Sequence, residues 1–170
     1  MKHTILIAEH AIAERVAALA EQINQDYEGR ELVVIAVTNG ALIFAADLFR
    51  KLRTTTYLDT VKASSYKAAR RGELTIKENF NISLSGRHVL LLDDILDSSV
   101  TLREIMEHIH TLKPASLRTC VLLDKPAGRT NGFQADYVGF TIPDKYVYGY
   151  GMDDEAGLLR NCPYIGAKEE

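Results

Sequence analysis

The sequence predicts an α/β protein whose mainly parallel, twisted sheet is flanked by helices. The apolar run 32–37 shows no polar alternation, which is typical of a strand covered on both faces, and 88–92 and 117–123 are interpreted as two further buried strands. Between these strands lie stretches in which apolar residues recur every three or four positions, as on one face of a helix. Alternating buried strands and helices form right-handed βαβ units, in which the strands lie parallel. A length of 170 residues fits one domain of this class.

The first half of the chain alternates between these two patterns. In order, we expect a strand over 4–7, a helix over 8–24, a strand over 32–37, a turn over 38–40, a helix over 41–52 and a β-compatible stretch over 57–66. The first helix presents Ile12, Val16 and Leu19 on a single apolar stripe. Residues 67–79 are polar and partly basic, which predicts an exposed loop or a hairpin tip.

The second half repeats the alternation and then changes character. In order, we expect a strand over 88–92, a loop over 93–100, a helix from 101 onward, a strand over 117–123 and a short strand over 136–140. Thr101 and Glu104 have the spacing of a capping box, and Pro114 ends that helix. Residues 141–170 hold several glycines, prolines and tyrosines, so we expect ordered loops there and no long helix.

Composition and charge argue against several classes of protein. Lysine and arginine number 20 against 23 aspartates and glutamates, whereas duplex-binding domains are usually strongly basic. No window approaches the roughly 18 apolar residues of a membrane span, and the apolar stretch near the N-terminus is too short for a signal peptide. Cys120 and Cys162 do not make a disulfide framework. We therefore expect a cytoplasmic protein that binds neither nucleic acid nor membranes.

The segment 93–101 carries the strongest chemical signal, because it follows a buried strand and leads into a helix. Ligands of parallel sheets bind at the carboxyl ends of the strands. The hydroxyls of Ser98, Ser99 and Thr101, with the free N–H groups of the helix N-terminus, form a cradle for an anion. The three carboxylates of this segment suit sugar hydroxyls, Mg²⁺ or a proton in transit. A phosphorylated ribose satisfies both halves, whereas the alternative interpretation is a helix cap with acidic neighbours.

Two further segments follow apolar runs and belong to the same predicted edge of the sheet, 38–41 and 124–126. Signatures of other sites are missing, because the chain has no G-x-G-x-x-G, no G-x-x-x-x-G-K-[ST] and no H-E-x-x-H. His108 and His110 are two residues apart on a predicted helix, so they face different directions and are interpreted as surface residues.

At this point the sequence resembles a known family. The stretch LLLDDILDSSVTL at 90–102 resembles the phosphoribosyl-diphosphate signature of type I phosphoribosyltransferases. Four more stretches resemble hypoxanthine-guanine phosphoribosyltransferase: SSY at 64–66, LLDKP at 122–126, ADYVGFTIPDKYVYGYGMD at 135–153 and RNCPYIG at 160–166. The resemblance implies the type I phosphoribosyltransferase fold in a single domain over 1–170. Its core would span about 8–140, a small hood would come from 1–7 and about 141–170, and a mobile loop would span about 65–80.

The resemblance also implies a reaction. Hypoxanthine or guanine would react with 5-phosphoribosyl 1-diphosphate in the presence of Mg²⁺, giving IMP or GMP and pyrophosphate. The protein would then be a purine salvage transferase with small-molecule substrates, assembled as a homodimer or homotetramer. Two alternatives remain open. One is an enzyme of the same fold that prefers xanthine or another base. The other is a nucleotide-sensing RNA-binding regulator, which the basic residues Lys67, Arg70 and Arg71 would favour.

By resemblance, the acidic segment would hold the sugar phosphate. Asp93 and Asp94 would bind the ribose hydroxyls and Mg²⁺, and Asp97 would act as the general base toward the purine imidazole ring. The 5′-phosphate would be bound by the residues that enter the helix, namely Ser98, Ser99, Val100 and Thr101. The diphosphate and the closing loop would involve Asn39, Gly40, Ser65, Tyr66 and Arg160, and Asp153 would hold a second Mg²⁺.

The purine would be bound by Ile95, Lys125, Tyr146, Val147, Met152 and Asp153. Lys125 would donate to the 6-oxo group, which favours hypoxanthine or guanine over adenine, and Tyr146 would stack on the base. Purely structural interpretations remain open for three of these positions. Lys125 would then be a surface lysine before a proline, Tyr146 would belong to a packed strand of alternating tyrosines, and 153–155 would be a solvated acidic turn.

Several positions depart from the family pattern. Thr38-Asn39-Gly40-Ala41 stands where the family commonly has Lys-Gly-Gly, so a positive charge is missing. Ser99 replaces a common glycine, which narrows the allowed backbone conformations. The family often has Glu-Asp where this chain has Asp93-Asp94, and Arg160 lies one residue later than usual. We expect these changes to affect affinity for the sugar diphosphate or base preference.

Overall fold

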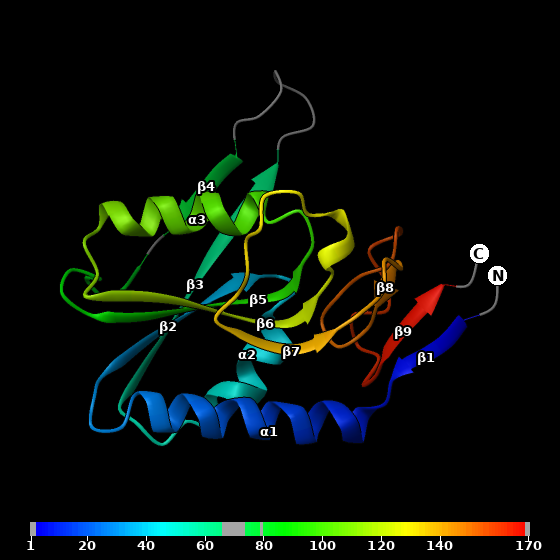
Figure 1. The fold of residues 1–170 in the computed structure, drawn as a ribbon, viewed down its shortest axis with the longest axis horizontal. Coiled ribbons are helices and arrows are strands. Elements are labelled where there is room, and N and C mark those ends of the chain that lie inside the picture. The colour runs from blue at the N-terminus through cyan, green and yellow to red at the C-terminus, as the bar shows by residue number, and fades with distance from the viewer. Residues whose placement is uncertain (1–2, 66–73, 79, 169–170) are drawn as a thin grey trace.

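The computed structural model describes residues 3–65, 74–78 and 80–168 (Figure 1). Its central sheet has the order β4-β3-β2-β5-β6-β7 and is parallel except for β4, which runs antiparallel to β3. The strands are β2 (Leu32–Thr38), β3 (Thr56–Ser65), β4 (Leu74–Glu78), β5 (His88–Leu96), β6 (Ser116–Asp124) and β7 (Tyr137–Thr141). The predicted α/β class with a mainly parallel sheet is therefore confirmed.

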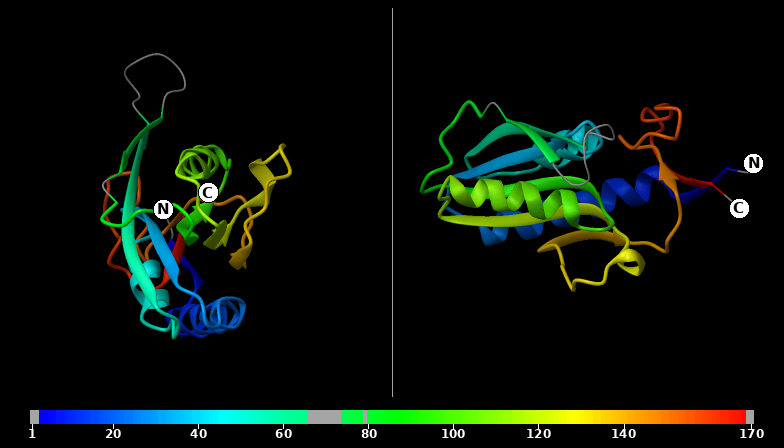
Figure 2. Two further views of the ribbon diagram at one scale, coloured as in Figure 1. Left: turned by 90° about the vertical axis from the view of Figure 1, so that its left-hand side faces the viewer. Right: turned by 90° about the horizontal axis from the view of Figure 1, so that it is seen from above.

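Helices cover both faces of this sheet (Figures 1 and 2). The helices α1 (Glu9–Asp26) and α2 (Leu42–Phe49) lie on one face, and α3 (Val100–Thr111) lies on the other. Alternate residues of each strand supply the two apolar clusters. In β2, for example, Val34 packs with the cluster of α1 and α2, whereas Val33 and Ile35 pack with that of α3. This double coverage is the physical reason for the uninterrupted apolar runs.

A second, smaller sheet forms the predicted hood. It has the order β1-β9-β8 and is antiparallel, with strands β1 (His3–Ile7), β8 (Val147–Tyr148) and β9 (Ile165–Lys168). The two ends of the described chain therefore lie side by side at one end of the core (Figure 1). Within the described part of 141–170 there is no helix, as expected.

Three local predictions are wrong in detail. The loop expected over 93–100 begins only after Leu96, because β5 stays paired with β6 as far as Leu96 opposite Asp124. The helix α3 begins at Val100 and its N-cap is Ser99 without a side-chain cap, so the predicted capping box of Thr101 is absent. The stretch 67–79 was expected to be an exposed loop or a hairpin tip; its residues 74–78 form the strand β4 and pair antiparallel with β3, which agrees with a hairpin but not with a loop over this whole range. Each error comes from pairing or backbone geometry that no local pattern reveals.

The remainder of the predicted mobile loop, including Tyr66 and the basic residues Lys67, Arg70 and Arg71, lies outside the described residues. A short 3₁₀ turn, Pro126–Gly128, follows β6. Among the described helices, none is both long and apolar enough to cross a bilayer.

Candidate active site

Asp93 and Asp94 stand next to each other near the carboxyl end of β5. The Oδ1 atom of Asp93 accepts the N–H of Asp94 at 2.9 Å, and Oδ1 of Asp94 accepts the N–H of Ile95 at 2.8 Å. Burial raises the pKa of Asp93 well above its usual range, and the neighbouring charge of Asp94 adds to this. Burial raises the pKa of Asp94 as well. These carboxylates therefore bind a proton more readily than carboxylates in water do.

The turn after β2 packs directly against Asp94. A Cβ atom placed on Gly40 would lie 2.0 Å from Oδ2 of Asp94, so a side chain at this position cannot be accommodated without moving the carboxylate. The peptide bond between Thr38 and Asn39 is cis. From the other side, a Cβ on Gly151 of the hood would lie 2.2 Å from the carbonyl oxygen of Gly40. The turn is thus held between β5 and the hood.

The N-terminus of α3 opens beside these carboxylates. Ser99, the N-cap, has a φ of +69°, which is the left-handed region that glycine adopts most easily. Its hydroxyl is buried and accepts Nδ2 of Asn131 at 2.8 Å, so a side-chain contact accompanies the unusual conformation. Ser98, Val100 and Thr101 are exposed around it. Of the three residues whose hydroxyls were predicted to form the anion cradle, Ser98 and Thr101 are therefore open to solvent, whereas the hydroxyl of Ser99 is bonded to Asn131.

Lys125 forms two ion pairs. Its Nζ lies 3.1 Å from Oδ2 of Asp97 and 3.0 Å from Oδ1 of Asp144. The lysine side chain is 11% exposed, whereas those of Asp97 and Asp144 are 52% and 67% exposed. Burial opposes the charge of Lys125, but the contacts with both carboxylates outweigh it and raise its pKa. The charged Lys125 thus bridges Asp97, the predicted general base, and Asp144. The sequence analysis did not identify Asp144 as part of the site.

Arg129 binds main-chain carbonyl groups beside Asp97 and Lys125. Its Nη1 lies 2.6 Å from Oδ1 of Asp124 and donates to the carbonyl oxygen of Leu96 at 3.0 Å. It also lies 3.4 Å from the carbonyl oxygen of Asp97 and 3.5 Å from that of Lys125. One buried guanidinium therefore ties together the ends of β5 and β6. No feature of the sequence around 129 distinguished it from a surface arginine.

A cavity of about 210 Å³ lies between the end of the sheet and the hood. Apart from Lys145, every residue that lines it was singled out from the sequence. The lining residues are Asp94, Ile95, Asp97, Lys125, Lys145, Tyr146, Val147, Met152 and Asp153. The structure thus brings the acidic segment, the lysine after β6 and the predicted purine-binding stretch into one cavity. Asp93 does not line it and lies behind Asp94, bonded to the same stretch of β5.

Arg160 joins the hood to this cavity. Its Nη2 lies 2.7 Å from Oδ2 of Asp153, and its Nη1 donates to the carbonyl oxygen of Gly151 at 2.7 Å. Since Gly151 also touches Gly40, the guanidinium lies near the turn predicted to bind diphosphate. Ser65 ends β3, and its side chain lies outside the described part of the chain, as does Tyr66.

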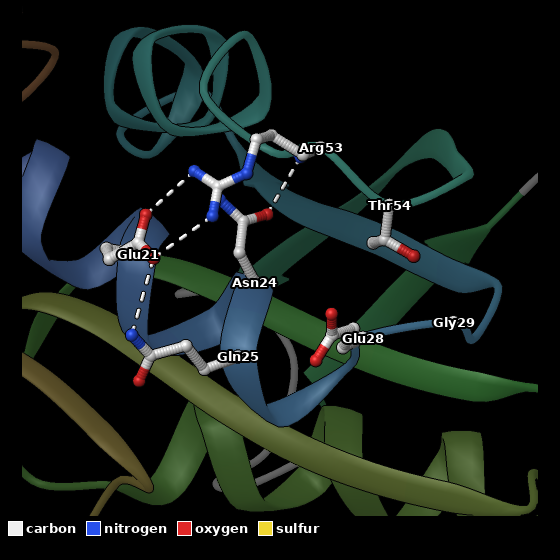
Figure 3. Close-up of a pocket in the computed structure, with 7 residues that line it drawn as sticks. All are labelled: Glu21, Asn24, Gln25, Glu28, Gly29, Arg53 and Thr54. Carbon is white, nitrogen blue, oxygen red and sulfur yellow. Dashed lines mark hydrogen bonds and ion pairs between the residues drawn. The ribbon is translucent and has the colours of Figure 1, made fainter.

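A larger cavity, of about 390 Å³, lies at the opposite end of the strands (Figure 3). Its polar side chains already bind one another: both Nη atoms of Arg53 contact the carboxylate of Glu21, and Asn24 bonds the N–H of Arg53 and the carbonyl oxygen of Lys51. None of the predicted site residues lines it. The smaller cavity, at the carboxyl end of the sheet, is therefore the candidate active site.

Comparison with known proteins shows the family to which the chain belongs. Residues 4–155 match the family model described as phosphoribosyl transferase domain, which defines the class of protein. The hypoxanthine-guanine phosphoribosyltransferase of Aquifex aeolicus is 39% identical over 173 residues, covering 99% of this chain and 96% of the relative. The hypoxanthine phosphoribosyltransferase of Escherichia coli is 37% identical and covers 98% of this chain and 96% of the relative.

A solved hypoxanthine-guanine phosphoribosyltransferase from Bacillus anthracis superposes with a TM-score of 0.90 at 40% identity, covering 98% of this chain and 99% of the other. The chain therefore belongs to the hypoxanthine-guanine phosphoribosyltransferase family. It also matches the bifunctional protein TilS/HprT of Listeria innocua at 40% identity, where it spans 25% of that longer protein.

Proposed function

We propose that the protein transfers the phosphoribosyl group of 5-phosphoribosyl 1-diphosphate to hypoxanthine or guanine, giving IMP or GMP. In this reaction the bond between ribose C1 and the diphosphate oxygen breaks, and the diphosphate leaves with the electron pair. A purine nitrogen forms the new bond to C1, and the imidazole ring loses a proton. The observation that carries the proposal is the single cavity that unites Asp97, Lys125, Tyr146 and Asp153 beside the open N-terminus of α3.

The purine would occupy the side of the cavity formed by the hood. Tyr146 is half-exposed and provides an aromatic face for stacking, while Ile95 and Met152 supply apolar contacts. Lys125 would donate to the 6-oxo oxygen, which suits hypoxanthine, guanine and xanthine but not the 6-amino group of adenine. The main chain of Val147 would contact the 2-position. Asp97, within reach of the same lysine, would accept the imidazole proton.

The sugar phosphate would lie across the end of the sheet. The hydroxyls of the exposed Ser98 and Thr101 and the main-chain N–H groups of Ser99 and Val100 would bind the 5′-phosphate at the positive end of α3. Asp93 and Asp94 would bind the ribose hydroxyls, and the turn at Asn39 and Gly40 would receive the diphosphate. Arg160 would compensate the negative charge of the diphosphate, and Ser65 and Tyr66 would contribute substrate contacts from the predicted closing loop.

The residues present fit Mg²⁺. Asp94 and Asp153 line one cavity and offer hard carboxylate oxygens, and Mg²⁺ in such sites usually takes one or two carboxylates together with substrate phosphates. The crowding of Asp94 against Gly40 keeps its carboxylate beside the predicted diphosphate turn. Among the described residues there is no cluster of three His, Cys, Asp or Glu ligands, so the substrate would complete the site. Bound there with Asp93 nearby, Mg²⁺ would neutralise charge on the leaving diphosphate.

A product assay tests the proposal. The purified protein is offered hypoxanthine, guanine, xanthine or adenine, each with 5-phosphoribosyl 1-diphosphate and Mg²⁺. We expect IMP or GMP and pyrophosphate, and no AMP. A preference for xanthine would support the alternative of another 6-oxopurine, whereas no nucleotide from any base would contradict the proposal. We also expect excess chelator to abolish turnover and added Mg²⁺ to restore it; undiminished turnover in chelator would exclude the metal requirement.

The proposal includes a homodimer or homotetramer in the cytoplasm. Both cysteines are free, which fits a reducing compartment. Sedimentation equilibrium of the purified protein would give the number of chains, and a monomer at micromolar concentration would contradict this part.

A further inference from the structure

Lys168, the last residue of β9, lies beside the aromatic side chain of the candidate purine site. Its N–H donates to the carbonyl oxygen of Tyr146 at 3.2 Å, which continues the β8–β9 ladder in which Val147 pairs with Ala167. Directly opposed residues of an antiparallel pair project from the same face of the sheet. Accordingly, Nζ of Lys168 lies 5.1 Å from the centroid of the Tyr146 ring, within the range of a cation–π interaction.

Tyr146 lines the cavity, whereas Lys168 does not. An aromatic ring has two faces, so a lysine over one face would leave the other for a ligand.

Further contacts hold this arrangement. The Tyr146 hydroxyl donates to the carbonyl oxygen of Asp153 at 3.3 Å, and Nζ of Lys168 lies 3.5 Å from Oε1 of Glu155. The lysine side chain is 19% exposed and that of Glu155 74% exposed, so the ion pair is largely screened by water. The contact with the ring is therefore the more important of the two for Lys168.

We propose that Lys168 is a positioning residue for purine binding, acting through Tyr146 from the face opposite the ligand. This inference rests on the proposed function, because it assigns the free face of Tyr146 to a purine. The cation draws π-electron density toward itself, which makes the ligand-side face less negative and strengthens offset stacking with an electron-rich base. It also restricts the orientation of the ring before the base arrives, so less side-chain freedom is lost on binding.

The test compares Lys168→Met, which keeps the length of the side chain without its charge, with Lys168→Arg, which keeps the cation. We expect Lys168→Met to raise KM for hypoxanthine or guanine and the Kd for GMP about 3- to 10-fold. Lys168→Arg should stay within about twofold of the wild type, because guanidinium also stacks on aromatic faces. Neither variant should change kcat or KM for 5-phosphoribosyl 1-diphosphate by more than about twofold, since the effect is confined to the base.

A matched control and a double-mutant cycle isolate the effect. Lys51→Met removes one positive charge from an exposed residue that follows α2 at the other end of the sheet, and should leave both constants unchanged. In a Tyr146→Leu background, Lys168→Met should have no further effect on the Kd for GMP. An equal loss in Lys168→Met and Lys168→Arg, or a full effect of Lys168→Met without the ring, would overturn the inference.

Measuring GMP binding separates this inference from the proposed reaction. If the wild type binds GMP but makes no nucleotide from any base, the proposed reaction fails, while the affinities of the variants still decide the role of Lys168. If turnover is normal and Lys168→Met binds GMP as tightly as the wild type does, only the inference fails. A wild type that neither binds GMP nor makes nucleotide overturns both.

Discussion

Replacing Gly40 by alanine should disable the sugar-diphosphate half of the site while leaving the purine half intact. An ideal Cβ at this position lies 2.0 Å from Oδ2 and 2.7 Å from Cγ of Asp94, whereas ordinary contacts begin at 3.4 Å. The carboxylate must therefore move by about 1.4 Å, the difference between 3.4 Å and 2.0 Å. The Asp94 side chain also accepts the N–H of Ile95, so this movement strains or breaks a hydrogen bond at the wall of the cavity.

We expect Gly40→Ala to lower kcat/KM for 5-phosphoribosyl 1-diphosphate about 100-fold, because a displacement of about 1 Å in a positioning group has an effect of this order. Overpacking of this kind should cost about 1–3 kcal/mol in free energy of unfolding. Steady-state kinetics with each substrate varied, together with thermal melting, measure both effects. The KM for hypoxanthine or guanine, by contrast, should change little, because the free base makes no contact with the diphosphate turn.

Gly128→Ala is the comparison variant. It places the same methyl group 3.2 Å from Oδ1 of Asp97, a contact that a shift of a few tenths of an ångström relieves. This variant should retain kcat/KM within about fivefold, because such a small displacement disturbs positioning little. If Gly40→Ala keeps the activity of the wild type, the close approach of Gly40 to Asp94 has no bearing on catalysis and the reasoning is refuted.

Three further changes test the carboxylates. Asp97→Asn should lower kcat by about 10²- to 10⁴-fold with an unchanged melting temperature, and full activity would exclude Asp97 as the base. Asp144→Asn should raise KM for guanine by at most about fivefold, because so exposed an ion pair contributes about 1 kcal/mol or less to holding Lys125; a much larger rise would assign Asp144 a direct role. Burial raises the pKa of Asp93 above its unfolded value, so its favourable contribution to stability is present below about pH 4 and is lost as the pH rises through the raised pKa. Without Mg²⁺, Asp93→Asn should therefore melt higher than the wild type at pH 8 but not at pH 4, and equal differences at both values would contradict this.

The sequence predicted most of the sheet and most of the residues that line the cavity of the candidate site, and particular residues show why. The run 32–37 is buried on both faces, and its pattern records that environment directly. Asp94, Asp97 and Lys125 follow or end such runs, and parallel strands bring their carboxyl ends to one edge. Such patterns are local, so they can be detected without knowing which strands are neighbours.

The errors concern elements whose limits depend on a partner. The strand β5 extends past Leu92 because β6 offers continued pairing, and 74–78 becomes a strand because β3 lies beside it. The helix α3 begins after Ser99 because that residue takes a left-handed conformation, which a search for a side-chain cap cannot detect. In each case the limit of the element depends on a partner strand or on a backbone dihedral angle, and neither is visible in the local pattern of apolar and polar residues.

The sequence by itself therefore determined the class of fold, the edge of the sheet that carries the site and most of the residues that line the cavity. Only the tertiary structure decided that Gly40 approaches Asp94, that Asp144 shares Lys125 with Asp97, that Arg129 binds the ends of two strands and that Lys168 lies against the Tyr146 ring. A burial pattern can be detected in residues that are neighbours along the chain. These contacts, by contrast, join segments that are distant in the sequence, and they depend on strand register and on how the loops pack. Their energies depend on distances of a few ångströms, which residue type and spacing along the chain do not specify.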